Sequence, residues 1–203
     1  MDEITNLEKK LFPKGNVCVV GCGRLGIRVV MDLVEVHRGG PEKIIVYDGA
    51  TIDYNDIIHR KLGGKIGENK AKFAERFYPE KIIGVDKHIT TEHLNLINED
   101  VVIFCMAGGN TLKLREEIIN YCNNKNIKTI GTNGVFGIDE KIKTGDGLYS
   151  PGPIEYANIT KPGHIVVGTE RYIKDGLPIT PYTLNEISKK IVIECLKMLN
   201  KLK

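Results

Sequence analysis

The stretch VCVVGCGRLGIRVV, residues 17–30, joins a short apolar run to a glycine-rich turn and a second apolar pattern. The first run, Val17–Val20, predicts a buried strand, and apolar residues then recur at helical spacing over Leu25–His37. The turn between them carries a G-x-G-x-x-G pattern made by Gly21, Gly23 and Gly26. Glycines there let the backbone approach a phosphate closely, and the phosphate charge then faces the N-terminus of the helix.

An aspartate follows the next predicted strand. Ile44–Tyr47 is a second apolar run, and Asp48 comes directly after it, at about the distance from the glycines where a carboxylate accepts both hydroxyls of a ribose. The pattern therefore predicts a bound nucleotide with a free ribose. In the alternative, the glycines serve only a tight strand–helix turn and Asp48 ends the strand by chance. The glycines and the aspartate by themselves fit NAD and ATP equally.

Strand and helix patterns alternate along the chain from residue 16 onward. Further strands are predicted at 82–85, 101–105 and 129–132, and further helices at 67–79, 90–97 and 111–123. Beyond about residue 134, glycine and proline favour antiparallel strands and an extended loop, and residues 181–199 then form an amphipathic helix. This order predicts an α/β fold: a Rossmann-like, doubly wound, mainly parallel sheet with added antiparallel strands and a C-terminal helix.

The composition suits one domain and argues against a nucleic-acid-binding, membrane-spanning or secreted protein. The 203 residues are 41% hydrophobic and 27% charged with a net charge of +3, so we expect residues 1–203 to form a single domain that binds no nucleic acid. No apolar run reaches the roughly 18 residues that span a membrane. The N-terminal MDEITNLEKK is too acidic and polar for a signal peptide. Five cysteines, an odd number, favour reduced thiols, and we expect a cytoplasmic protein.

The stretch DGATIDYNDIIHRKLGGKIGENKAKFAERF, residues 48–77, distinguishes ATP from NAD. In it Asp48 is followed by Asn55, by Arg60 and by the G-x-x-K-A pattern Gly67–Ala71. This order resembles the E1-like adenylating family, which includes the ubiquitin-activating enzymes and the ThiF and MoeB types that adenylate sulfur-carrier proteins. Because Asn55 and Arg60 lie further apart than is usual in the family, Asp56 is an alternative match for the asparagine.

The resemblance covers roughly residues 15 to 200. Three later segments, DVVIFCMAGGNT, TIGTNGVFG and GLPITPYTLNEISKKIVIECLKML, also resemble family segments. The implied ATP contacts are Gly21, Gly23, Arg24, Leu25, Gly26, Asp48, Asn55, Arg60 and Lys70. Among these, Arg60 and Lys70 are implied to be catalytic, because they would stabilise charge on the phosphates. The nearby His59 and His88 are expected to be polar loop residues.

The family's magnesium-binding aspartate has no counterpart in this chain. Its position falls in the stretch Met106–Gly109, which contains no carboxylate. We therefore expect Mg²⁺ to arrive with ATP and assign it no protein ligand. An acceptor carboxylate should lie over the carboxyl ends of the fourth and fifth strands, and its expected contacts are Met106, Gly108, Asn110, Asn133 and Phe136. Alternatively, Asn110 caps the following helix and Phe136 belongs to the core.

Further absences indicate one branch of the family. The chain lacks the two CxxC pairs of the family's zinc site, and it has no cysteine between Cys122 and Cys195. With its small size and its CMAGGN loop, it resembles the small E1-like proteins of [Fe]-hydrogenase guanylylpyridinol cofactor biosynthesis. That resemblance implies ATP-dependent adenylylation of the pyridinol carboxylate, giving acyl-AMP and pyrophosphate. The acyl group would then pass to a thioester-forming partner protein, and the enzyme would be a homodimer.

Two other functions stay open at this point. An NAD(P)-dependent oxidoreductase explains the glycines and Asp48 but leaves Arg60 and Lys70 without a role. A non-catalytic nucleotide-binding sensor is favoured by the missing magnesium aspartate.

Overall fold

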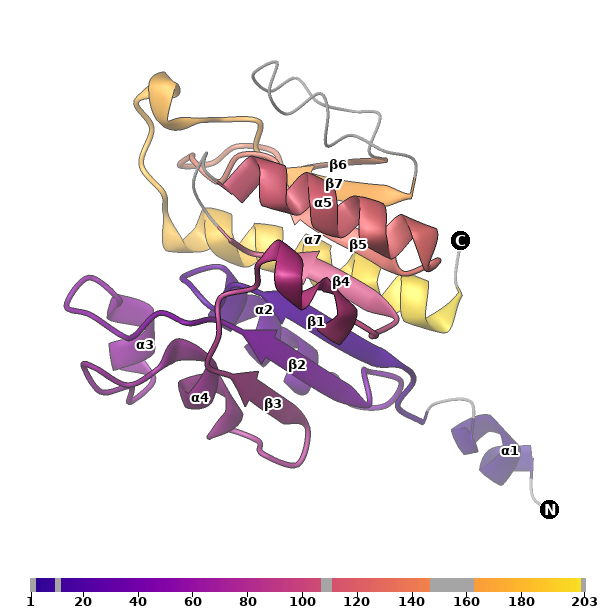
Figure 1. The fold of residues 1–203 in the computed structure, drawn as a ribbon. Helices are drawn as coiled ribbons and strands as arrows, with labels where there is room; N and C mark the ends of the chain where they lie inside the picture. The colour runs from indigo at the N-terminus through magenta and orange to yellow at the C-terminus, as the bar shows by residue number, and fades with distance from the viewer. Residues whose placement is uncertain (1–2, 10–11, 107–110, 147–162, 202–203) are drawn as a thin grey trace.

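A seven-stranded sheet runs through the computed structural model, which describes residues 3–9, 12–106, 111–146 and 163–201 (Figure 1). Its strands are β1 (Asn16–Val20), β2 (Lys43–Tyr47), β3 (Ile82–Val85), β4 (Val101–Phe104), β5 (Lys128–Thr132), β6 (Lys143–Asp146) and β7 (His164–Gly168). Their order is β3-β2-β1-β4-β5-β7-β6, with β6 antiparallel to β7 and the other neighbours parallel. The predicted doubly wound, mainly parallel sheet is thus confirmed.

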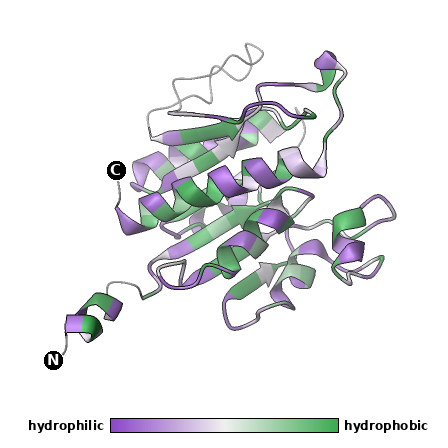
Figure 2. Cartoon of the chain, turned by 180° about the vertical axis from the view of Figure 1, so that it is seen from behind, coloured by the Kyte–Doolittle hydropathy of each residue, from purple (hydrophilic) through white to green (hydrophobic). Residues whose placement is uncertain are grey.

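The central strands are buried on both faces of the sheet. In β1, Val17 and Val19 belong to one hydrophobic cluster, whereas Cys18 and Val20 belong to a second cluster on the other face. Side chains alternate between the two faces of a strand, so an unbroken apolar run in the sequence feeds both clusters. In Figure 2 the strands accordingly stand out as hydrophobic, while the helices carry hydrophilic residues on their outer sides.

Helices cover both faces of this sheet. Residues of α2 (Gly26–Val34), α4 (Lys70–Glu75) and α7 (Pro181–Asn200) pack in the first cluster, and residues of η1 (Thr91–Leu96) and α5 (Leu112–Asn124) pack in the second. The remaining helices are α1 (Glu3–Lys9), α3 (Ile57–Lys61) and η3 (Ile173–Asp175). Figure 1 shows α1 projecting from the body near the N-terminus. Among the described residues, none of the helices combines the length and apolarity that a membrane crossing requires.

Several predicted boundaries were wrong. The helix predicted over Leu25–His37 ends at Val34, because the chain soon turns through positive φ angles at Arg38 and Gly39 that a right-handed helix does not permit. The helix predicted at 67–79 shrinks to α4, whose first turn is capped by the Asn69 side chain accepting from the Lys72 N–H. The short helix predicted at 90–97 is a 3₁₀ helix, and α3 was not predicted.

The order of the strands reverses at β1, which has β2 on one side and β4 on the other. The chain leaves β1 toward β2 on one side, and it returns to pair β4 against the other side of β1. In open α/β sheets, ligands bind where the strand order reverses in this way, outside the carboxyl ends of the strands. The loops that follow β1 and β4 are therefore where a ligand site is expected.

Candidate active site

The glycine loop after β1 packs directly on the loop after β4. The Gly21 N–H donates to the Tyr47 carbonyl (2.9 Å), and Gly21 has a φ of 95°. A Cβ at Gly21 would lie 2.8 Å from the Met106 nitrogen, and one at Gly26 would lie 2.0 Å from the Gly21 oxygen. Both positions therefore require glycine for packing. Gly23 is different: a Cβ there would meet nothing within 4 Å, which leaves open space for a ligand.

Asp48 is tied to this loop. Its buried carboxylate accepts from the Cys22 N–H through Oδ2 (2.6 Å) and from the Ala50 N–H through Oδ1 (2.8 Å). Two backbone donors thus hold the carboxylate beside the glycines, which makes a chance strand end a poor explanation. An ionised carboxylate offers about four acceptor sites. Asp48 therefore retains sites with which it can accept from two ribose hydroxyls.

Lys70 lies at the same edge of the sheet and is paired. Its ammonium lies 3.0 Å from the Asp56 Oδ2, with 14% of the Lys70 side chain and 10% of the Asp56 side chain exposed. The Lys70 N–H donates to the Ala50 carbonyl, next to Asp48. Burial alone would raise the pKa of Asp56, but the Asp53 N–H and the Lys70 ammonium outweigh it and lower that pKa. Of the two possible matches to the family's asparagine, Asp56 contacts the lysine.

The other predicted ATP contacts lie around the glycine loop. The Arg24 guanidinium donates to the Asn55 carbonyl (3.2 Å), and the Arg60 guanidinium donates to the Tyr54 carbonyl (3.1 Å). Arg24, Asn55 and Arg60 are all exposed. Leu25 is buried in the core, so only its backbone is offered to a ligand.

His59 was wrongly expected to be a polar loop residue. It is fully buried, its Nε2 lies 2.8 Å from the Cys22 carbonyl oxygen, and its ring packs on Phe73 with a centroid distance of 5.6 Å. Burial lowers the pKa of His59. The short helix α3 presents this side chain to the glycine loop, and five residues are too few for a periodic sequence signal. His88, by contrast, is exposed.

The predicted acceptor contacts are only partly brought together. Asn133 is buried after β5, and its Oδ1 accepts from the Tyr172 hydroxyl, while its Nδ2 has no partner among the described residues. Met106 lies against Gly21, and its carbonyl accepts from the buried Arg115 guanidinium. Phe136 is half-buried. Gly108 and Asn110 lie outside the described residues.

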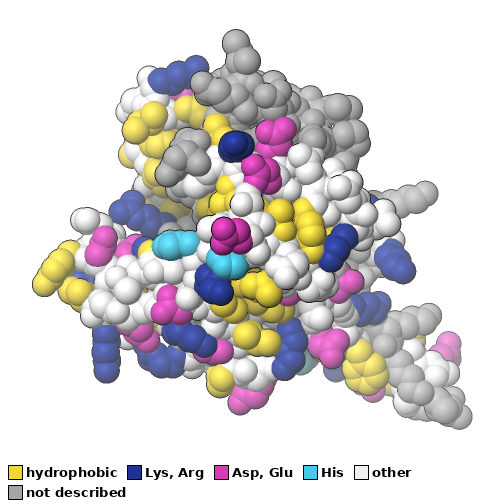
Figure 3. All heavy atoms as spheres, viewed as in Figure 1, with side chains coloured by type: hydrophobic (Ala, Val, Ile, Leu, Met, Phe, Trp, Pro, Cys, Tyr) yellow, Lys and Arg dark blue, Asp and Glu magenta, His cyan; other side chains and the backbone are white. Residues whose placement is uncertain are grey.

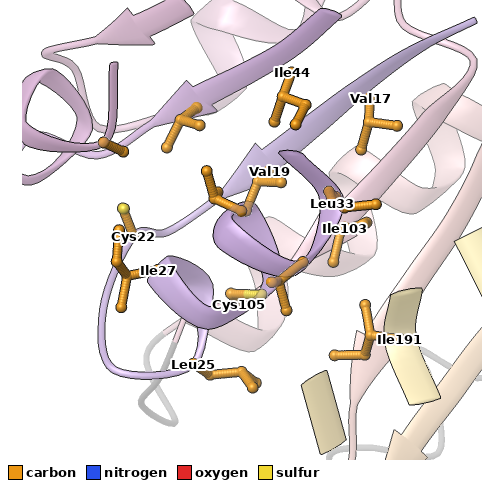
Figure 4. Packing of buried hydrophobic residues seen from close by; sticks show 14 of the residues in the cluster. Val17, Val19, Cys22, Leu25, Ile27, Leu33, Ile44, Ile103, Cys105 and Ile191 are labelled. Atoms are coloured by element: carbon orange, nitrogen blue, oxygen red, sulfur yellow. The ribbon is translucent and has the colours of Figure 1, made fainter. Parts of the chain in front are cut away.

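The five cysteines are free and buried, as expected for reduced thiols. Cys22 and Cys105 belong to the same hydrophobic cluster, together with Val19 and Ile27 (Figure 4). Burial raises the pKa of the Cys105 thiol to about 12, and burial also raises the pKa values of the other four. All five are therefore protonated at neutral pH and are poor nucleophiles.

Charges of both signs are mixed over the face shown in Figure 3, so that no patch of a single sign dominates it. Within the described ranges, no three His, Cys, Asp or Glu side chains gather into a group that could hold a metal ion.

The chain was compared with known proteins by sequence and by structure. No family model matches the chain. It is 55% identical over 196 residues to the uncharacterized protein MJ0693 of Methanocaldococcus jannaschii, a match that spans 97% of this chain and 81% of that protein. The structure of guanylylpyridinol- and ATP-bound HcgE from Methanothermobacter marburgensis superposes with a TM-score of 0.89 at 39% identity, covering 94% of this chain and 98% of HcgE.

A more distant structure shares the fold alone. The ATP complex of E. coli TcdA, a tRNA N6-threonylcarbamoyladenosine dehydratase, matches with a TM-score of 0.79 at 20% identity, over 96% of this chain and 90% of TcdA. The fold and these matches place the chain among the ATP-dependent adenylyltransferases of the E1-like class. At 39% identity over nearly the full length of both chains, this protein belongs within that class to the HcgE family.

Proposed function

We propose that this protein uses ATP to adenylylate the carboxyl group of a guanylylpyridinol, giving acyl-AMP and pyrophosphate. The observation that carries the proposal is the buried Asp48 carboxylate, which two backbone N–H groups hold beside the open space at Gly23. The choice of ligands is supported by HcgE, which is 39% identical and whose structure contains guanylylpyridinol and ATP.

The reaction needs little acid–base chemistry. A carboxylate with an ordinary pKa of about 4 is already ionised at neutral pH, so no general base is required. One carboxylate oxygen attacks the α-phosphorus in line, a bond forms between them, and the bond from the α-phosphorus to the leaving pyrophosphate oxygen breaks. Catalysis then consists mainly of positioning and of stabilising negative charge.

We assign that charge stabilisation to Arg60 and Lys70. The Arg60 guanidinium is exposed, and its hydrogen bond to the Tyr54 carbonyl can be exchanged for a phosphate oxygen at little cost. The Lys70 ammonium is held by Asp56 and acts as a fixed point charge. Mg²⁺ carried by the triphosphate would neutralise further charge, and we assign it no protein ligand.

The acceptor is assigned to the carboxyl ends of β4 and β5. There, Asn133 offers a buried amide donor, and Phe136 offers a ring beside the aromatic pyridinol. We also assign Met106 to the acceptor, and its backbone lies against Gly21 of the glycine loop. The proposal also includes Gly108 and Asn110 of the same loop.

An acyl adenylate is reactive and requires an acceptor. All five cysteines of this chain are buried, and the pKa of the Cys105 thiol, the one nearest the proposed acceptor, is raised to about 12. We therefore assign the thioester to a cysteine of a separate partner protein. A homodimer is part of the proposal, because Ile4, Leu7 and Phe12 in and beyond α1 are largely exposed.

Calorimetry and a pyrophosphate assay test the proposal together. ATP should bind, and pyrophosphate should appear only when a guanylylpyridinol with a free carboxylate is added, not with its carboxamide. Binding of NAD without ATP would instead establish the oxidoreductase. Binding of ATP with no turnover of the carboxylate would establish the sensor.

A further inference from the structure

The backbone of Cys22 is held at both its N–H and its carbonyl by side chains from other elements. Its N–H donates to Asp48 after β2 (2.6 Å), and its carbonyl oxygen lies 2.8 Å from the Nε2 of His59 in α3. Gly21 and Gly23 flank this residue, and glycine rotates more freely than any other residue. Without the two anchors, the peptide planes of the loop would have several orientations available.

The His59 contact also determines the form of the imidazole. A carbonyl oxygen only accepts hydrogen bonds, so the Nε2 must carry the proton. The other ring nitrogen, Nδ1, lies 3.9 Å from the Asp56 Oδ1, and the second oxygen of Asp56 pairs with Lys70. With Nε2 protonated, Nδ1 carries a lone pair and makes no hydrogen bond to the Asp56 carboxylate. The contact of His59 with the glycine loop and the Asp56–Lys70 ion pair are therefore neighbouring but separate contacts.

Burying the His59 imidazole is unfavourable for the stability of the fold. The imidazole is fully buried, and its Nδ1 has no hydrogen-bond partner among the described residues. An apolar side chain in its place would avoid burying an unpaired polar atom. Only a polar side chain, however, can hold the Cys22 carbonyl from that direction.

We propose that His59 is a positioning residue for the triphosphate of ATP. By fixing the Cys22 carbonyl, it orients the glycine loop so that the N–H groups of the first turn of α2 face the phosphates, as anion sites at helix N-termini require. The inference rests on the proposed use of ATP, and it concerns the phosphates rather than the nucleoside.

Two substitutions separate this role from a structural one. His59→Phe keeps a ring against Phe73 but removes the donor, whereas His59→Gln keeps an N–H near the Nε2 position. We expect His59→Phe to weaken binding of ATP about tenfold, the equivalent of one hydrogen bond, with adenosine binding unchanged. His59→Gln should restore ATP affinity to within about threefold of the starting protein. A structural role would lower the affinities for adenosine and ATP alike.

Equal loss or no loss for the two ligands in folded His59→Phe would overturn the inference. Should that variant fail to fold, ¹⁵N NMR of the imidazole in the unaltered protein decides. The inference predicts that Nε2 carries the proton and that the imidazole resonances shift when ATP is added but not when adenosine is added. A proton on Nδ1, or no shift with ATP, would contradict it. If the unaltered protein binds no ATP, the proposed function itself is wrong.

Discussion

The nucleotide half and the acceptor half of the carboxyl edge are built in different ways. Around the glycine loop, side chains bind backbone groups of neighbouring elements: Asp48 accepts from two N–H groups, and the Asn69 amide donates to the Asp48 carbonyl (2.8 Å). The same amide also donates to the Asp86 carboxylate (2.7 Å). At the end of β5, the Asn133 N–H donates to the Val167 carbonyl and the Glu170 N–H donates to the Asn133 carbonyl (both 3.0 Å), while the Asn133 side chain accepts from the Tyr172 hydroxyl. In the nucleotide half, side chains hold the loops together, whereas in the acceptor half the loops are joined by backbone hydrogen bonds and Asn133 adds its side-chain contact with Tyr172.

This difference fits the two proposed ligands. A triphosphate and a ribose are common to every adenylating enzyme, so the same few groups can hold them: backbone N–H groups, the Asp48 carboxylate and the cations Arg60 and Lys70. An acceptor has to be distinguished from other carboxylates, which requires particular side chains placed to make hydrogen bonds. The following substitutions test whether the two halves really act separately.

The largest effect is expected for Asp48→Ala. Two ribose hydroxyls would lose their shared acceptor, and each hydrogen bond to a charged group contributes about 1.5–3 kcal/mol. Calorimetry should show that the affinities for both ATP and AMP fall about a hundredfold or more. Asp139→Ala, at an exposed aspartate after β5, is the control and should change neither affinity. Unchanged ATP affinity in Asp48→Ala would place the ribose elsewhere.

Arg60→Ala and Lys70→Ala come next. Each should slow pyrophosphate release about 10- to 100-fold, since one charge-assisted contact is lost, and each should alter AMP binding little because AMP lacks the β- and γ-phosphates. Lys70→Ala should also lower the free energy of unfolding by about 1–3 kcal/mol, because the buried Asp56 would lose its cation while keeping the hydrogen bond from the Asp53 N–H. Arg60→Ala should leave stability unchanged, as should the control Lys61→Ala, also exposed. Equal losses of affinity for ATP and AMP would show that the two cations do not contact the leaving pyrophosphate.

A pair of glycine substitutions sharpens the comparison within the loop. Gly23→Ala should leave the melting temperature unchanged, since its Cβ meets no protein atom, yet it should weaken ATP binding about tenfold by occupying the space proposed for phosphate. Gly26→Ala should instead destabilise the fold, because its Cβ would lie 2.0 Å from the Gly21 oxygen. Thermal unfolding and calorimetry distinguish the two results. Full ATP affinity in Gly23→Ala would argue against phosphate at this position.

The smallest effects are expected in the acceptor half. Asn133→Ala and Tyr172→Phe should each raise the KM for the acceptor about two- to tenfold, which corresponds to one neutral hydrogen bond of about 0.5–1.5 kcal/mol. The KM for ATP should stay constant. The exposed Tyr182 provides the control Tyr182→Phe. A parallel change in the KM for ATP would show that the two halves are not independent.

The same contrast explains what the sequence alone could predict. The glycine loop, Asp48 and the alternation of strands and helices follow from local patterns, because a strand, a turn and a helix that are adjacent in sequence are adjacent in space. The roles of His59 and Tyr172 could not be predicted in this way. Their contacts join residues 37 and 39 positions apart, and neither side chain belongs to a periodic pattern.

The ends of the helices could not be predicted from the hydrophobic periodicity either. Val36 continues the helical spacing past Val34, but the left-handed turn at Arg38 and Gly39 redirects the chain toward β2. Likewise, the Asn69 cap rather than the glycine pattern sets the start of α4. In both cases a backbone conformation or one side-chain hydrogen bond overrides the hydrophobic pattern.

Isotope transfer tests the central claim, that the acceptor carboxylate attacks the α-phosphorus of ATP. The guanylylpyridinol carboxylate is labelled with ¹⁸O, incubated with the enzyme and ATP, and the acyl adenylate is trapped with hydroxylamine. Because the attacking oxygen stays on phosphorus, mass spectrometry should find one ¹⁸O atom in the AMP that is released. AMP without the label, or ADP and phosphate in place of AMP and pyrophosphate, would contradict the account.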